Sequence, residues 1–341
     1  MIIAHTVVFI RPTAPETVLR IDSVLSDLAS PLFALVIGVT TVLVAPTGGG
    51  DPAVRRRFTR QFAIKGLALV PIGWLLSVRP SGVDVVLDPL GITMVCAAPL
   101  LFVRSRVLSV GVVALVVLGP VLNEAARGLT VAAPAVAGAP VVSELLDWFV
   151  LGGNYRVTGL LPLLLLGIVL ARWLTGQGTV RRLRGSAMLL VVAGVVFLAA
   201  QTTRPLGFAD AKLSGGHVDI VRDVGLAVGC HAAVVLVVEF APRASRLVLE
   251  PIAVQGRLAL SVYVGHVAVL MVAWLPPVRD RLFPQLEQPA VGWVLQLGLV
   301  VLCWLAAALW WRRWGTGPVE RVIGWVSGRH RPSRRTVPVT G

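Results

Sequence analysis

Charged residues are scarce in this sequence. Of its 341 residues, 14% are Asp, Glu, Lys or Arg, whereas 56% are hydrophobic. A soluble domain needs a more polar surface, so this composition excludes soluble folds and predicts a multi-pass membrane protein. Short segments join the apolar runs and leave no room for a separate soluble domain. We therefore expect residues 1–341 to form a single integral-membrane domain.

Acidic residues are fewer than basic ones, and the net charge at pH 7 is +14. Such an excess would suggest nucleic acid as the partner of a soluble protein. Here the basic residues lie in short segments between apolar runs, which is the positive-inside pattern of membrane proteins. We expect membrane lipids, and no nucleic acid, among the partners.

Cysteine is rare, and internal repeats are not evident. Cys96, Cys230 and Cys303 all fall inside apolar runs without a CxxC pair, so they are expected to be buried apolar residues, with no metal site. Transporters commonly contain repeated halves with broken helices in matching positions. The lack of a repeat argues against that class.

The apolar runs predict an all-α bundle, because lipid admits only helices and closed barrels and these runs lack the alternation of barrel strands. With the N-terminus inside, most arginines fall on one side, which predicts that both termini are cytoplasmic and that 313–341 is a basic cytoplasmic tail. The pattern predicts about ten spans. They cover roughly 1–10, 27–46, 61–79, 83–103, 107–125, 156–173, 187–202, 221–239, 254–275 and 291–312.

The first predicted span, MIIAHTVVFI, is short for a bilayer. A helix of this length reaches about 15 Å, or half of the hydrocarbon core. We expect it to be the end of a helix that starts further upstream. Close helix packing is expected at Gly38 and at the GLAVG segment, Gly225 to Gly229.

Polar residues interrupt the run from Gln255 to Leu275. Tyr263 and His266 share one helical face, which should look into protein or a wet cavity because polar groups are costly in lipid. They either hold helices together or line a functional cavity. His231, in the middle of another span, allows the same two interpretations.

A basic cluster follows the second span in TGGGDPAVRRRFTRQ and contains Arg55, Arg56, Arg57 and Arg60. Such a cluster is typical of a cytoplasmic loop under the positive-inside rule and of contact with anionic lipid. It is also suited to a phosphorylated cofactor on the cytoplasmic side. On the outer side, Asn154 and Tyr155 lie in a polar segment that is typical of a sugar-binding surface or of an ordinary solvated one.

Three stretches, DLASPLFALVIGVT, GRLALSVYVGHVAVL and GPVERVIGWVSGR, follow one another along the chain. Together they resemble bacterial membrane proteins related to the catalytic domain of heparan-alpha-glucosaminide N-acetyltransferase, within the acyltransferase-3 superfamily. The resemblance implies that acetyl-CoA or another acyl-CoA on the cytoplasmic side donates an acyl group. The acceptor would be a hydroxyl or amine of a glycan or a lipid-linked sugar on the outer side.

The resemblance also suggests site residues. His5 matches the histidine at the end of the family's first span, and Asp27 matches the aspartate that opens the second. The animal enzyme has a histidine just before that aspartate, but this chain has none between His5 and Asp27. A His–Asp pair at the outer mouth suits acyl transfer, because a carboxylate can orient a histidine base.

The main prediction is therefore an acyl-CoA-dependent acyltransferase in the plasma (inner) membrane. His5 and Asp27 are its predicted catalytic residues, and the four clustered arginines bind the cofactor. Tyr263, His266 and His231 line its substrate cavity. A transporter or flippase for a lipid-linked sugar and a non-catalytic membrane scaffold are the alternatives.

Overall fold

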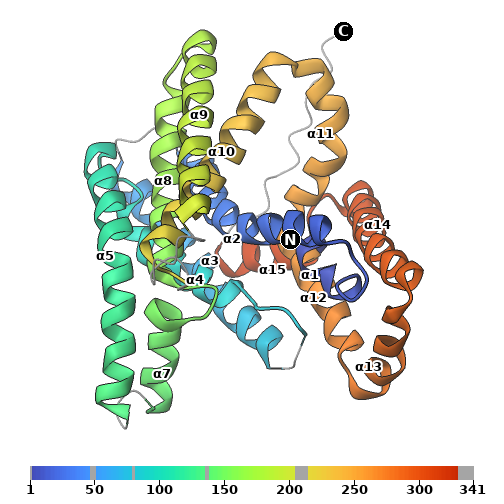
Figure 1. Cartoon of the computed structure of the whole chain (residues 1–341). Helices are drawn as coiled ribbons and strands as arrows, with labels where there is room; N and C mark the ends of the chain where they lie inside the picture. The colour runs from blue at the N-terminus through green and yellow to red at the C-terminus, as the bar shows by residue number, and fades with distance from the viewer. Residues whose placement is uncertain (1, 47–50, 79–80, 135–137, 204–213, 329–341) are drawn as a thin grey trace.

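The computed structural model describes residues 2–46, 51–78, 81–134, 138–203 and 214–328, and these parts contain helices and no strand. The all-α prediction is confirmed for them. The helices (Figure 1) are α1 (Ile2–Thr6), α2 (Glu16–Val44), α3 (Pro52–Ser77), α4 (Leu87–Ala97), α5 (Ser105–Ala132), α7 (Pro140–Leu146), α8 (Val157–Thr175), α9 (Thr179–Thr203), α10 (His217–Phe240), α11 (Pro242–Arg257), α12 (Ala259–Ala273), α13 (Pro276–Leu282), α14 (Pro289–Trp314) and α15 (Pro318–Val326). Short helical turns lie at Val7–Phe9 (η1), Ala98–Leu100 (η2), Asp147–Leu151 (η3) and Phe283–Glu287 (η5).

Among the described helices, six are long and apolar enough to cross a membrane: α2, α5, α8, α9, α10 and α14. A seventh span results if α12 and the segment Pro276–Glu287 count as one, although a bend of 78° separates them. Pro276 and Pro277 follow the end of α12 and cannot donate backbone hydrogen bonds, which explains the break. The chain is thus a multi-pass membrane protein.

The predicted count of ten spans is therefore corrected to six or seven. The predicted span at 1–10 forms only α1 and η1, and the span at 83–103 forms α4 and η2, which end at Leu100. The span at 61–79 overlaps the second half of α3, which ends at Ser77, and the first half of that helix carries a run of basic residues and so leaves a short apolar part. Apolar runs predicted the helices but not whether each one is long enough to cross.

Close backbone contacts hold the helices together at the predicted Gly38 and Gly225, and also at Gly167, which was not predicted. A Cβ at Gly38 of α2 would collide with the carbonyl oxygen of Leu164 in α8, and one at Gly167 of α8 would collide with that of Leu35. A Cβ at Gly225 of α10 would lie 3.0 Å from the carbonyl oxygen of Ala193 in α9. Small residues thus let the backbones of these helices approach closely.

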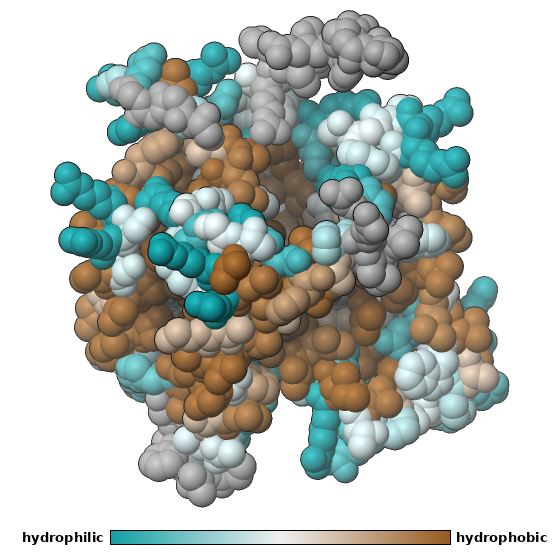
Figure 2. Space-filling view, turned by 90° about the horizontal axis from the view of Figure 1, so that it is seen from above, coloured by the Kyte–Doolittle hydropathy of each residue, from teal (hydrophilic) through white to brown (hydrophobic). Residues whose placement is uncertain are grey.

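In Figure 1, α5, α8, α9 and α10 lie on one side of the molecule and α11 to α14 on the other, with α2, α3 and α15 between them. The outer faces of the long helices are apolar (Figure 2), with side chains such as Val110, Val195 and Leu309 more than half exposed. Exposed apolar faces of this extent suit contact with lipid. The region between the two sides brings together distant parts of the sequence, including the N-terminal α1 and the later α12.

Candidate functional site

A pair of histidines joins α1 to α12. The Nδ1 atom of His5 lies 2.8 Å from the Nε2 atom of His266, and the two rings stack with centroids 5.0 Å apart. His266 is 1% exposed, and His5 is partly buried. Two ring nitrogens at this distance share one hydrogen, so the tautomers of the two rings are coupled.

The backbone of α12 selects these tautomers. The Nδ1 atom of His266 lies 2.9 Å from the carbonyl oxygen of Val262, which can only accept, so this nitrogen carries the hydrogen. In neutral His266 the Nε2 atom then accepts from Nδ1–H of His5. The Nε2 atom of neutral His5 is left unprotonated, and it makes no hydrogen bond among the described residues. His5 is thus arranged as a base whose orientation His266 fixes.

Tyr263 completes a cluster of three rings, which we call the His5–Tyr263–His266 cluster. Its ring meets that of His266 edge-on with centroids 5.3 Å apart, and it meets that of His5 at 6.0 Å. The buried hydroxyl accepts a hydrogen bond from the backbone N–H of Val86 at 3.2 Å. The structure therefore brings together three of the candidate residues, and the shared face of Tyr263 and His266 is as the helical spacing predicted.

Asp27 does not pair with His5, which corrects the predicted His–Asp arrangement. Its carboxylate lies 3.0 Å from Arg222, which is also close to Asp219 and Asp223, and no hydrogen bond joins Asp27 to His5 among the described residues. The cause is the start of α2. This helix begins at Glu16, so Asp27 lies three turns inside it rather than at its opening.

His231 also lies outside the cluster. It belongs to α10, and its Nε2 atom is buried without a hydrogen-bond partner among the described residues. No ring contact joins it to His5 or His266 there. The sequence, which placed it with Tyr263 and His266, gave no means of telling which face of its helix meets the cavity.

Helix α12 is fixed at its N-terminus by α15. The carboxylate of Glu320 accepts hydrogen bonds from the backbone N–H groups of Leu260 at 2.8 Å and Ser261 at 3.0 Å, and from the Ser261 hydroxyl. The N–H of Val319 donates to that hydroxyl at 3.1 Å. Two of the three stretches that carry the family resemblance, GRLALSVYVGHVAVL and GPVERVIGWVSGR, thus meet here. Glu320 holds the helix that carries Tyr263 and His266.

Sequence reasoning missed Glu320, although a signal was present. Within the basic segment from 313 to 341 it is the only acidic residue. An acid that satisfies the free N–H groups of a helix N-terminus stabilises that helix. Residues 329–341 of the predicted tail lie outside the described residues.

A polar surface lies near Tyr263 at the starts of α4 and α8. Asp84 accepts a hydrogen bond from the side chain of Asn154, and Tyr155 is bonded to Ser30 of α2. Burial, together with the nearby carboxylate of Asp84, raises the pKa of Tyr155 to about 12, so its hydroxyl stays protonated. The groups offer both hydrogen-bond donors and acceptors, as a sugar hydroxyl requires.

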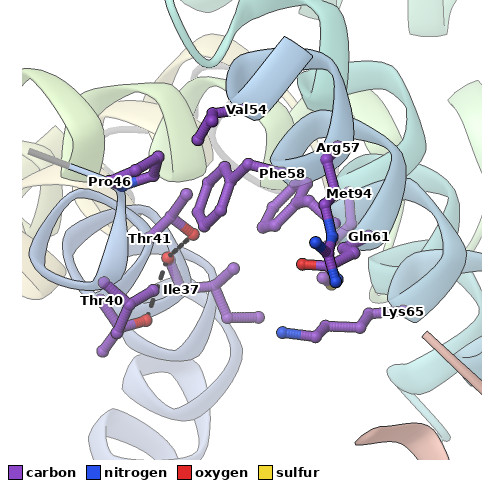
Figure 3. A pocket seen from close by; sticks show the side chains of 12 residues that line it. Ile37, Thr40, Thr41, Pro46, Val54, Arg57, Phe58, Gln61, Lys65 and Met94 are labelled. Carbon is purple, nitrogen blue, oxygen red and sulfur yellow. Dashed lines mark hydrogen bonds between the residues drawn. The ribbon is translucent and has the colours of Figure 1, made fainter. Parts of the chain in front are cut away.

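A basic pocket of about 490 Å³ lies between the end of α2 and the first half of α3. Figure 3 shows the side chains of Arg57, Gln61 and Lys65 around it, and no acidic side chain is among the lining residues. Arg55 instead lies over the ring of Phe102, 5.5 Å from its centroid. The structure therefore divides the predicted arginine cluster.

The other two arginines of the cluster, Arg56 and Arg60, are exposed and do not line the pocket. Lys65 was not among the predicted cofactor residues, although its spacing from Gln61 places both on one face of α3. Gln61 also donates a hydrogen bond, at 3.5 Å, to the backbone carbonyl of Gly328 beyond α15. The pocket is thus connected through α15 to the start of α12.

An apolar groove of about 390 Å³, with His266 among its lining residues, lies between α12 and α14. Its walls are largely aliphatic, and Ser261 and His266 are its principal polar residues. No group of three or more His, Cys, Asp or Glu residues that could hold a metal ion occurs in the described ranges. The site therefore combines a histidine pair, a basic pocket and an apolar groove.

The fold and this site define a multi-pass helical membrane protein with a buried histidine pair. Residues 168–329 match a family model described as "Protein of unknown function (DUF418)". No curated protein and no solved structure matches the chain. The matched segment includes Tyr263, His266 and Glu320, whereas His5 and the basic pocket precede it.

Proposed function

We propose that this chain is a membrane acyltransferase that moves an acyl group, in the first instance acetyl, from acyl-CoA to a glycan or lipid-linked sugar. The observation that carries the proposal is the histidine pair, in which His266 leaves Nε2 of His5 unprotonated. A base positioned in this way activates a hydroxyl or amine for attack on a carbonyl. The resemblance to the heparan-alpha-glucosaminide N-acetyltransferase relatives supports the same chemistry.

In the proposed reaction, Nε2 of His5 takes the proton from the acceptor hydroxyl. The acceptor oxygen forms a bond to the thioester carbonyl carbon, and the carbon–sulfur bond of acyl-CoA breaks. The thiolate of CoA leaves with the electron pair of that bond and then receives the proton from His5. The acyl group passes directly to the acceptor, so this route needs no acyl-histidine intermediate.

The basic pocket is the proposed site for the phosphate groups of acyl-CoA. Arg57 and Lys65 place positive charge on the wall of this pocket, which suits an anion. We assign the acceptor to the polar surface of Asp84, Asn154 and Tyr155. In this arrangement donor and acceptor approach from opposite sides of the plasma membrane, with the pocket and α15 on the cytoplasmic side.

Single cysteines test this orientation in a background without the native cysteines. A membrane-impermeant thiol reagent applied to intact cells should label a cysteine at 287, in η5, and should label one at 56 only after lysis. Positions 56 and 287 are both exposed, so access to the reagent depends on the side of the membrane. Labelling of both from outside would contradict the orientation.

The activity is tested with purified protein, radiolabelled acetyl-CoA and a panel of glycan and lipid-linked acceptors. We expect label to move to one class of acceptor in proportion to enzyme. The competing function is a transporter for a lipid-linked sugar, which the bend of 78° after α12 favours because transporters use broken helices. Movement of an unmodified lipid-linked sugar across proteoliposomes, without label transfer, would support the transporter instead.

A further inference from the structure

The apolar groove between α12 and α14 has the dimensions of one leaflet of a membrane. The two helices run antiparallel, because Arg257 meets Trp311 at one end and Leu270 packs with Leu299 at the other. The lining residues extend from Leu258, just before α12, to Val269 and from Trp310 to Leu299 on α14. Eleven residues of helix correspond to about 16 Å. Half of a ~30 Å hydrocarbon core is about 15 Å, so the groove matches the depth of one lipid chain.

The two ends of this groove differ in chemistry. At the end near Leu258 and Trp310, α14 continues into Trp311, Arg312 and Arg313, and the two arginines are exposed. Arg257 lies over the ring of Trp311, 5.0 Å from its centroid. Tryptophans and arginines at one end of a span are typical of the level of the lipid headgroups.

The opposite end of the groove is lined by aliphatic residues, Val269 and Leu299 among them. A ligand that fits must therefore have a long apolar part at this end and a negative charge at the basic end. An anionic phospholipid has both, whereas a free sugar or a free phosphate lacks the apolar part. The proposed lipid-linked acceptor approaches from the outer side, opposite to the basic end of the groove. Charge and length thus select one class of occupant.

We propose that the groove binds one acyl chain of an anionic phospholipid, with the headgroup beside Arg312 and Arg313. The chain would pass Gly265 and His266, so the lipid would contact one member of the histidine pair. The binding does not depend on acyl transfer, so the lipid site can be tested independently of the proposed activity. It adds a lipid ligand to the site.

Gly265 offers a direct way to fill the groove. This residue lines the groove and is exposed, and a Cβ built on it meets no atom within 4 Å. Gly265→Leu therefore places a side chain in the lipid's space without a backbone clash. Gly298→Leu on α14 is the matched control, since Gly298 is exposed and equally free of neighbours but does not line the groove.

The experiment measures binding of dioleoylphosphatidylglycerol and dioleoylphosphatidylcholine to the delipidated full chain by native mass spectrometry. Wild type should bind one phosphatidylglycerol more tightly than phosphatidylcholine. Gly265→Leu should weaken phosphatidylglycerol binding by about tenfold or more, equivalent to about 1.4 kcal/mol. Gly298→Leu should bind as wild type does.

The headgroup is tested by Arg312→Gln together with Arg313→Gln. We expect phosphatidylglycerol binding to weaken about fivefold or more, since basic residues near a headgroup attract anionic lipid. Phosphatidylcholine binding should stay unchanged. Arg181→Gln with Arg184→Gln, an exposed pair at the start of α9, is the control.

Ala306→Leu is a second groove-filling variant in case Gly265→Leu does not fold, because Ala306 is an exposed lining residue of α14. Loss of binding in the folded groove variants, with both controls unaffected, supports the lipid site. Equal wild-type affinity for the two lipids, or wild-type binding in a folded groove variant, would overturn it.

Discussion

The carboxylate of Glu320 accepts two hydrogen bonds from Ser261, one from its hydroxyl and one from its backbone N–H at 3.0 Å. Fifty-nine residues separate the two in sequence. This contact fixes the start of α12, the helix on which Tyr263 and His266 lie. The position of the histidine pair therefore depends on a residue of α15 that touches neither imidazole.

The first prediction concerns that contact. Glu320→Gln should weaken the hold on α12, because hydrogen bonds to a charged group contribute about 1.5–3 kcal/mol and a neutral amide accepts more weakly. We expect a lower Tm in detergent and a lower kcat. Glu287→Gln, at an exposed position in η5, should change neither.

The second prediction uses a glycine beside the same contact. A Cβ at Gly317 would collide with the Glu320 carboxylate and the Ser261 hydroxyl, so Gly317→Ala should reproduce the effect of Glu320→Gln. Gly324→Ala in α15 is the control, because a Cβ there meets nothing within 4 Å. Equal Tm values for the two alanine variants would show that the contact does not hold α12.

The third prediction concerns the packing of α2 on α8. Gly38→Ala should lower the free energy of unfolding by about 1–3 kcal/mol, because the added methyl group forces the two backbones apart. Gly194→Ala in α9, where a Cβ meets no neighbour within 4 Å, should leave stability unchanged. Thermal unfolding of both variants in the same detergent measures the difference.

The helices themselves could be predicted from the sequence, because long apolar runs in lipid can satisfy their backbone hydrogen bonds only as helices or as strands of a closed barrel. Gly38 and Gly225 were expected to permit close packing, and the structure confirms this. The number of spans could not be predicted in the same way. Whether the short α4 crosses depends on its tertiary surroundings, which the hydropathy of Leu87–Leu100 does not encode.

The site was only partly predictable. Helical spacing places Tyr263 and His266 on one face, but no local pattern brings His5 to them across 261 residues of chain. The error at Asp27 came from a helix boundary, since the polar residues before it were taken for a loop and instead belong to α2. Boundaries of this kind are the least certain part of any sequence interpretation.

The fourth prediction concerns the basic pocket. Arg57→Gln with Lys65→Gln should raise the KM for acyl-CoA and leave kcat nearly unchanged, because the lost interaction is with the donor's phosphates. The difference from wild type should shrink at high salt, which screens exposed charges. Arg56→Gln with Arg60→Gln, outside the pocket, should have a smaller effect. Equal increases in KM for the two pairs of variants would indicate that the overall positive charge of this region, and not the pocket, attracts acyl-CoA.

The fifth prediction tests whether Asp27 or His266 is the partner that orients His5. Asp27→Asn should reduce acyl transfer only in proportion to the loss of folded protein, because Asp27 pairs with Arg222. His266→Ala should lower kcat beyond any loss of folded protein, since His5 then loses the group that fixes its tautomer. A fall in kcat per folded molecule for Asp27→Asn alone would restore the His–Asp arrangement.

The central claim is that His5 is the base in acyl transfer, and the most direct measurement is the rate of label transfer from radiolabelled acetyl-CoA by His5→Ala. The rate is expressed per molecule of folded, inserted protein, with Tyr263→Phe as a variant that keeps the neighbouring ring. We predict that His5→Ala lowers kcat by about 100-fold or more, the usual contribution of a positioned base. Transfer by folded His5→Ala at the wild-type rate would contradict the account.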